Sequence, residues 1–126
     1  MLQKKDPTKR AQELHDLIED ERRKRHTTTA VGDTDSDISI VGTNEIYLRS
    51  EIKRGLLPHE IVAKIKPGNY AEENILDTAA EKNLKIVNIG ASRPICLDCE
   101  EKIKALEIET NTEFSGKKSK NRIGKP

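Results

Sequence analysis

The sequence predicts a three-layer α/β sandwich, in which a mixed sheet lies between helices on both faces. One observation is the order of patterns along the chain: a helix, two short strands, a helix, a strand and a helix. A second is the apolar run at residues 85–91, which is typical of a central strand. A third is the length of 126 residues, which suits one small domain. We assign residues 1–110 to this domain and residues 111–126 to a basic, disordered tail.

The first element is predicted to be one helix that ends in a basic run at residues 22–26. Asp6 is placed to cap it, and Pro7 suits its first turn. The basic run fits a helix C-terminus, where the dipole favours cations, and phosphate contact is the alternative. His15 is expected at the rim or in solvent. Four apolar residues recur at helical spacing and form one apolar stripe: Ala11, Leu14, Leu17 and Ile18.

Two strands are expected next. Residues 27–31 are β-branched and short, and a second strand begins at residue 38 and continues through Val41. The polar turn between them has three alternating aspartates. It lacks the glycine and terminal glutamate of a calcium-binding loop, so we interpret it as a solvated hairpin.

Residues 49–66 have the least regular pattern. Two apolar pairs, at 56–57 and 61–62, predict a short helix broken near Pro58. His59 lies in this segment.

The following helix is expected to begin at Asn69, a favourable capping residue, and to end at Asn83. Glu72 and Glu73 fall in its first turn, where negative charge is favoured. Glu72 stands three residues after Asn69, which also fits the glutamate of a capping box, a purely structural role. Four residues are expected to face the core: Ile75, Leu76, Ala79 and Ala80.

Two cysteines occupy the start of the third helix. Pro94 places Cys96 and Cys99 in a first turn, where the partial positive charge of the helix lowers the thiol pKa and favours the thiolate that a metal needs. Two cysteines alone cannot form a disulfide scaffold. Before context is considered, this spacing fits a redox pair as well as half of a zinc site. A weak fourth strand is expected near residues 105–109.

Glu72 with the two thiols forms most of a catalytic zinc site. Such a site uses about three protein ligands, and a carboxylate then acts on the bound water. In zinc deaminases the third ligand is a histidine two residues before the glutamate. This chain has Tyr70 at that position, and His59 is the alternative ligand that we considered.

These motifs resemble the zinc-dependent cytidine deaminase-like superfamily, and they are most similar to the deaminase domains of bacterial polymorphic toxins. The resemblance rests on residues 71–76 and 89–99, extends upstream to residues 28–32 and 41–45, and covers roughly residues 8–108. The chain departs from the family pattern at Tyr70. It also departs at Ile95, which separates Pro94 from the first cysteine.

The resemblance implies hydrolytic conversion of cytosine to uracil by zinc-activated water, with Glu72 as proton shuttle. It implies that Cys96, Cys99 and the residue at the Tyr70 position hold zinc. It also implies that Asn44 touches the substrate sugar, for which a turn residue is the alternative. Ser92 and Arg93 are also expected to bind substrate near the pocket mouth. For Arg93, the alternative is that its side chain braces the loop.

Tyr70 predicts weak zinc binding or none, because a phenol with a pKa of about 10 is an uncommon zinc ligand. We expect either an enzyme silenced by a Tyr-for-His exchange, a natural pseudoenzyme, or an active variant with an unusual site. The functional alternatives are a non-catalytic interaction domain on the same fold, a nucleoside deaminase and a redox thiol protein.

Charge and composition limit the partners. A net charge of +1 gives no overall basic field, so nucleic-acid binding must use local patches. Cytosine in a nucleic acid is the preferred substrate. No apolar run reaches the length of a membrane span and no signal peptide is recognised, so no membrane partner is expected. The toxin resemblance implies secretion as the C-terminal part of a larger toxin, action in the target-cell cytoplasm and a cognate immunity protein.

Overall fold

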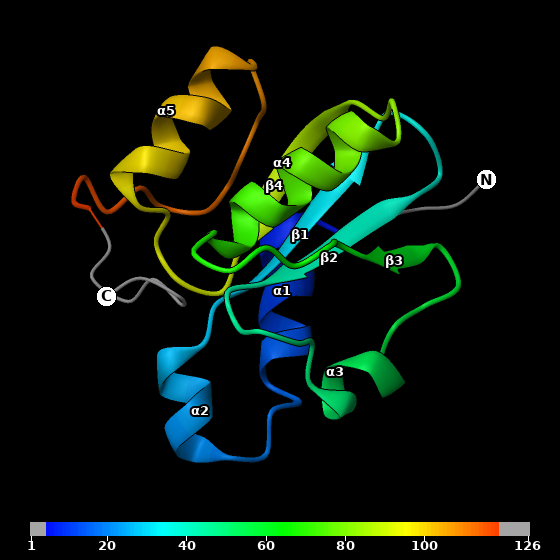
Figure 1. Ribbon diagram of the computed structural model, residues 1–126, viewed down its shortest axis with the longest axis vertical. Coiled ribbons are helices and arrows are strands. Elements are labelled where there is room, and N and C mark those ends of the chain that lie inside the picture. Colours follow the sequence, from blue (N-terminus) through cyan, green and yellow to red (C-terminus); the bar gives the residue numbers. More distant parts are fainter. Residues whose placement is uncertain (1–4, 119–126) are drawn as a thin grey trace.

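The computed structural model describes residues 5–118. A sheet of four strands forms the middle of the molecule (Figure 1). The strands are β1 (Thr29–Thr34), β2 (Ser39–Thr43), β3 (Glu60–Val62) and β4 (Ile86–Ala91). The helices are α1 (Pro7–His15), α2 (Glu21–His26), α3 (Ser50–Arg54), α4 (Ala71–Glu81) and α5 (Leu97–Ala105).

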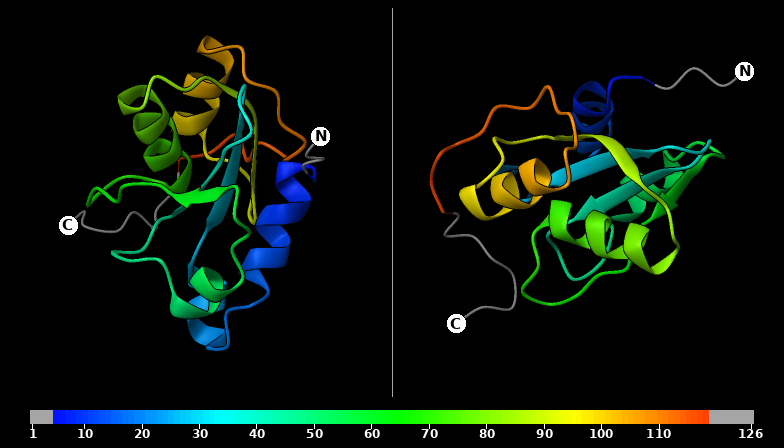
Figure 2. Two further views of the ribbon diagram at one scale, coloured as in Figure 1. Left: turned by 90° about the vertical axis from the view of Figure 1, so that its right-hand side faces the viewer. Right: turned by 90° about the horizontal axis from the view of Figure 1, so that it is seen from above.

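The sheet is mixed and has the strand order β3-β2-β1-β4. β1 is antiparallel to both β2 and β4, whereas β2 and β3 are parallel. Figure 2 shows α1 on one face of the sheet, and α4 and α5 on the other. The predicted α/β sandwich is therefore confirmed. The beginning of β1 meets the ends of β2 and β4, because β1 runs in the opposite direction.

Each face of the sheet has its own apolar core. On the α1 face the cluster includes Leu14, Val31, Val41, Leu48 and Ile52. On the other face the cluster includes Ile40, Ile75, Ile89, Cys99 and Ile103. The alternation of Ala30 and Val31, and of Ile40 and Val41, between the two clusters follows the two-residue period of a strand.

Helix α4 approaches the sheet closely because two strand residues lack side chains. A Cβ at Gly42 would lie 2.6 Å from the carbonyl oxygen of Ala71 and 2.9 Å from Cγ1 of Ile75. A Cβ at Gly32 would lie 2.6 Å from Cγ2 of the same isoleucine. Ile75 therefore packs directly on the backbone of β1 and β2.

The prediction of one N-terminal helix is wrong. α1 ends at His15, and a separate helix, α2, begins after Asp20, whose side chain accepts hydrogen bonds from the amides of Arg22 and Arg23. His15 is buried rather than solvated: its imidazole contacts Thr29 Oγ1 at 3.1 Å and the carbonyl oxygen of Lys24 at 2.8 Å. These two contacts tie the end of α1 to α2 and to β1.

The structure corrects two further expectations about secondary structure. Residues 61–62 belong to strand β3 and not to a helix, and β3 pairs with Ser39, Ile40 and Val41 of β2. The cap of α4 is Tyr70 and not Asn69. The expected weak strand near residue 109 is present as a parallel bridge between Asn88 and Glu109.

Residues 111–118, which we call the C-terminal strap, pack on the domain. Thr112 Oγ1 accepts a hydrogen bond from the amide of Ala91 (2.9 Å), and Ile95 exchanges backbone hydrogen bonds with the strap. The domain therefore continues beyond residue 110 to residue 118. The rest of the predicted tail, residues 119–126, lies outside the described residues. Within residues 5–118, every helix is too short or too polar to span a lipid bilayer.

We predict that Gly90→Ala destabilises the fold. An added Cβ would lie 2.1 Å from the backbone nitrogen of Thr8, so α1 would have to move away from β4. The expected loss is roughly 3 kcal/mol in the free energy of unfolding, measured by urea denaturation. Gly55→Ala is the matched control: the only contact of its Cβ under 3 Å is with the flexible end of the exposed Leu17 side chain, at 2.5 Å. This control should change stability by at most about 1 kcal/mol. Equal effects of the two substitutions would contradict the prediction.

Candidate functional site

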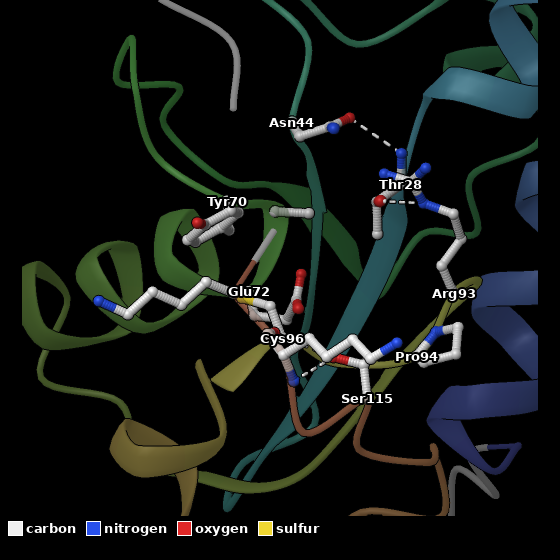
Figure 3. A pocket seen from close by; sticks show the side chains of 11 residues that line it. Thr28, Asn44, Tyr70, Glu72, Arg93, Pro94, Cys96 and Ser115 are labelled. Atoms are coloured by element: carbon white, nitrogen blue, oxygen red, sulfur yellow. Dashed lines mark hydrogen bonds between the residues drawn. The ribbon is translucent and has the colours of Figure 1, made fainter. Parts of the chain in front are cut away.

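A pocket of about 300 Å³ lies where the beginning of β1 meets the ends of β2 and β4 and the N-termini of α4 and α5. Figure 3 shows the side chains that line it. Segments far apart in the sequence contribute to it: Thr28, Asn44, Tyr70, Glu72, Arg93 and Cys96. The structure therefore brings most of the sequence-predicted site residues to one cavity.

Glu72 is buried at the pocket wall with 4% of its surface exposed. Burial raises the pKa of its carboxyl group to about 7, and the neighbouring Cys96 adds to the increase. A hydrogen bond from its own backbone amide acts in the opposite direction. A carboxyl group that titrates near neutral pH can both accept and donate a proton there, as a general acid–base group requires.

The capping role belongs to Glu73 instead of Glu72. Glu73 Oε1 accepts a hydrogen bond from the amide of Tyr70 at 2.8 Å, and Oε2 accepts one from Lys102 Nζ of α5 at 2.5 Å. Glu73 thus joins the first turn of α4 to α5. Glu73 stands three residues after Tyr70, which is the spacing of a capping box. This signal can be recognised in the sequence only when Tyr70 is known to be the capping residue.

The two thiols lie at the start of α5. Cys96 is the capping residue and lines the pocket, while Cys99 lies behind it and is fully buried. A hydrogen bond from the Cys99 thiol, with help from the amides of Cys99 and Asp98, lowers the pKa of Cys96 to about 6. The same hydrogen bond and burial raise the pKa of Cys99. The shared hydrogen bond therefore favours the thiolate at Cys96 over the thiolate at Cys99.

The third zinc ligand of the predicted site is not supplied by a histidine. Tyr70 lines the pocket with 7% of its surface exposed. His59 lines a different hollow beside Arg10 and Glu60. Across the described part of the chain, no three histidine, cysteine or acidic side chains are grouped so that they could hold a metal ion. Of the three ligand positions of the predicted zinc site, Cys96 and Cys99 occupy two and Tyr70 stands at the third.

The polar wall of the pocket is connected by hydrogen bonds. Asn44 Oδ1 accepts from the amide of Thr28 at 2.9 Å, and Arg93 Nε donates to Thr28 Oγ1 at 2.8 Å (Figure 3). Burial lowers the pKa of Arg93, and the neighbouring Glu72 opposes that change. Ser92 differs from the other predicted site residues. Its Oγ accepts from the amide of Thr29 at 3.0 Å, which fastens β4 to β1, and it does not line the pocket.

The C-terminal strap forms a wall that the sequence did not predict. Ser115, Lys117 and Lys118 line the pocket. The carbonyl oxygen of Lys117 accepts a hydrogen bond from the amide of Leu97 at 3.0 Å, in the first turn of α5. The strap thus adds two cationic side chains to the pocket that Arg93 also lines.

Comparisons of this chain with models of protein families, with curated proteins and with solved structures found no match. The family assignment accordingly stays a prediction from the motifs.

We predict that Cys96 reacts with iodoacetamide as a thiolate at neutral pH. In the metal-free chain, the pH dependence of alkylation should have a midpoint at about 6. Cys99→Ala removes the hydrogen bond that stabilises the thiolate, so it should move the midpoint toward the ordinary thiol value of about 8.5. Mass spectrometry of the modified residue gives the readout. A midpoint that is the same in both forms would show that the Cys99 thiol does not stabilise Cys96.

Proposed function

We propose that this chain is a toxin-type cytosine deaminase domain in which Tyr70 replaces one zinc ligand. The observation that carries the proposal is a single pocket that is lined by both the buried Glu72 and Cys96. Asn44 and Arg93 line the same pocket, on the side away from the helices that carry the thiols and the acid. The motif resemblance supplies the reaction class. The pocket supports that class because it places the acid–base group Glu72 and the thiol of Cys96 around one cavity.

The size of the pocket supports a single base as the occupant. About 300 Å³ is at the lower end of the range for ligand sites. A base can enter such a cavity only when it is unstacked, so a polynucleotide substrate must be single-stranded or flipped. Glu72 would move the proton, because its pKa near 7 matches neutral conditions.

Basic side chains support a polynucleotide over a free nucleoside. Lys117 and Lys118 of the strap and Arg93 of the loop after β4 all line the pocket. Beyond Arg93 lies the basic helix α2, because Arg93 Nη1 is 3.5 Å from the carbonyl oxygen of Arg25. Cations from separate segments around a base pocket can hold the phosphates that precede and follow the base.

The first test restores the missing ligand. Tyr70→His should bind one zinc per chain, whereas the unaltered chain and Tyr70→Phe should bind much less than one, as measured by metal analysis after dialysis. Only the histidine form should release ammonia from cytosine substrates. Stoichiometric, chelator-resistant zinc in the unaltered chain would show that Tyr70 or another group serves as a ligand.

A control within the histidine form separates Glu72 from the metal site. Tyr70→His with Glu72→Gln should retain zinc and fold but lose turnover by at least about 10²-fold, because a positioned general acid–base group contributes this much. If Glu72 only supported the start of the helix, the change would alter stability by about 1 kcal/mol or less and turnover would persist.

The second test identifies the substrate. The Tyr70→His form is assayed on single-stranded DNA, double-stranded DNA, RNA, cytidine and deoxycytidine at two salt concentrations. A polynucleotide enzyme should lose activity as salt increases, because each phosphate contact releases counterions. Rapid turnover of free cytidine that does not depend on salt would instead identify a nucleoside deaminase.

The low pKa of Cys96 favours one rival function, thiol–disulfide exchange. Reversible formation of a Cys96–Cys99 disulfide, together with no zinc binding by Tyr70→His, would favour that rival. A third outcome is binding to a target molecule with no zinc binding, no disulfide formation and no turnover in either the unaltered chain or Tyr70→His. That outcome would identify a non-catalytic interaction domain.

A further inference from the structure

Two neighbouring apolar side chains are exposed close to the pocket. Ile46 is 68% exposed and Tyr47 is 54% exposed, in the loop that follows β2. Single exposed apolar residues are common, but an adjacent pair that includes a tyrosine places a sizeable apolar area in water. Such an area indicates a contact surface.

The loop presents this pair from fixed positions on both sides. Glu45 before it is buried, and its carboxylate accepts a hydrogen bond from Arg49 Nε at 3.0 Å. Leu48 after it is 2% exposed and packs in the core of the α1 face. Ile46 and Tyr47 are therefore held outward between two anchored residues.

The loop runs beside the segment that joins α2 to β1. At the pocket edge, Asn44 Oδ1 accepts from the amide of Thr28 at 2.9 Å. Farther out, Glu45 Oε2 lies 3.9 Å from Arg23 Nη1 of α2. Tyr47 follows Asn44 by three residues, so its Cα lies at most roughly 11 Å from the Cα of Asn44 at the pocket edge.

Helix α2 gives the surface beside this loop a positive charge. Its six residues include five basic side chains in succession, none of them buried: Arg22, Arg23, Lys24, Arg25 and His26. Arg23 and Lys24 have weak ion pairs at 3.9 Å, and no ion pair is found for Arg22 or Arg25 within residues 5–118. The whole chain has a net charge of only +1, so this concentration is a local feature.

We infer that Tyr47 and α2 form a platform for the single-stranded nucleic acid that leads out of the pocket. Tyr47 stacks on the base next to the target cytosine, and α2 contacts the phosphates of that segment. This rests on the proposed function for the identity of the base in the pocket. An exposed aromatic ring beside a cationic helix matches the way in which single strands are bound, by stacking and phosphate contacts together. The phosphates of a nucleic acid neutralise the positive charge of α2, whereas a protein partner does so only if it presents acidic side chains there.

The test measures binding of the unaltered chain, because neither zinc nor turnover is needed. The probe is a labelled 12-nucleotide single strand with one central cytosine, followed by fluorescence anisotropy. Tyr47→Ala should weaken binding about 5- to 100-fold, the range expected for loss of one stacked base, and Tyr47→Phe should restore it. Leu106→Ala is the matched control, because Leu106 is 55% exposed at the far end of α5 and should have no effect (Figure 1).

Two further readouts distinguish stacking and charge from a general loss of structure. Placing 2-aminopurine on either side of the cytosine should show a fluorescence change on binding at one of these positions, and Tyr47→Ala should abolish it. Arg22→Gln with Arg25→Gln should reduce the slope of log K against log salt by about 0.7 for each contact removed.

The outcomes separate this inference from the proposed function. Loss of oligonucleotide binding in Tyr47→Ala, with rescue by phenylalanine, supports the platform even if Tyr70→His never deaminates cytosine. Unchanged binding in Tyr47→Ala overturns the platform and assigns the exposed pair to another partner such as a protein, while deamination by Tyr70→His would still stand. Absence of oligonucleotide binding by the unaltered chain also overturns it.

Discussion

The contact of Ile75 with the backbone of Gly32 and Gly42 is the constraint on which the site depends. A Cβ at either glycine would lie within 3 Å of this side chain, so α4 lies closer to the sheet than strand residues with side chains would allow. The side-chain amide of Asn74 then reaches the carbonyl oxygen of Thr43 at 3.1 Å and fixes the helix along its axis. This depth is what buries Glu72 and places it beside the strand ends.

The burial of Glu72 lowers the stability of the fold at neutral pH and gives its carboxyl group a pKa that suits proton transfer. A carboxyl group whose pKa is raised by burial stabilises the fold fully only below its unfolded value of about 4.5, and that contribution is lost as the pH increases toward its folded value of about 7. The fold thus tolerates a destabilising acid at neutral pH. Groups of this kind concentrate at functional sites, where a pKa near neutrality is useful. Glu73, one residue away, is satisfied by Tyr70 and Lys102 and performs the structural task.

Tyr70 contributes to the fold and to the pocket in different ways. The fold uses the backbone of this residue, since its amide donates to Glu73 and its conformation starts α4. The side chain lies at the pocket wall and also belongs to the apolar cluster that contains Cys96 and Cys99. An exchange of aromatic residues here therefore changes both the donor chemistry of the pocket and the packing of this cluster. The start of α5 and the C-terminal strap also hold the thiols.

The sequence by itself determined the elements whose causes are local. The apolar run of β4, the helix that follows Pro94 and the two thiols in its first turn were all predicted, because their signals lie within a few residues of one another. The grouping of Asn44, Glu72, Arg93 and Cys96 was predicted through the motif resemblance. Tertiary structure alone decided the rest, because the deciding contacts are distant in sequence. The contact of His15 with Thr29 accompanies the break between α1 and α2. Pairing with β2 makes residues 60–62 a strand. The contact with Lys102 allows Glu73 to join α4 to α5. The C-terminal strap became part of the pocket because its backbone pairs with Ile95 and Leu97, which no pattern within residues 111–118 could indicate.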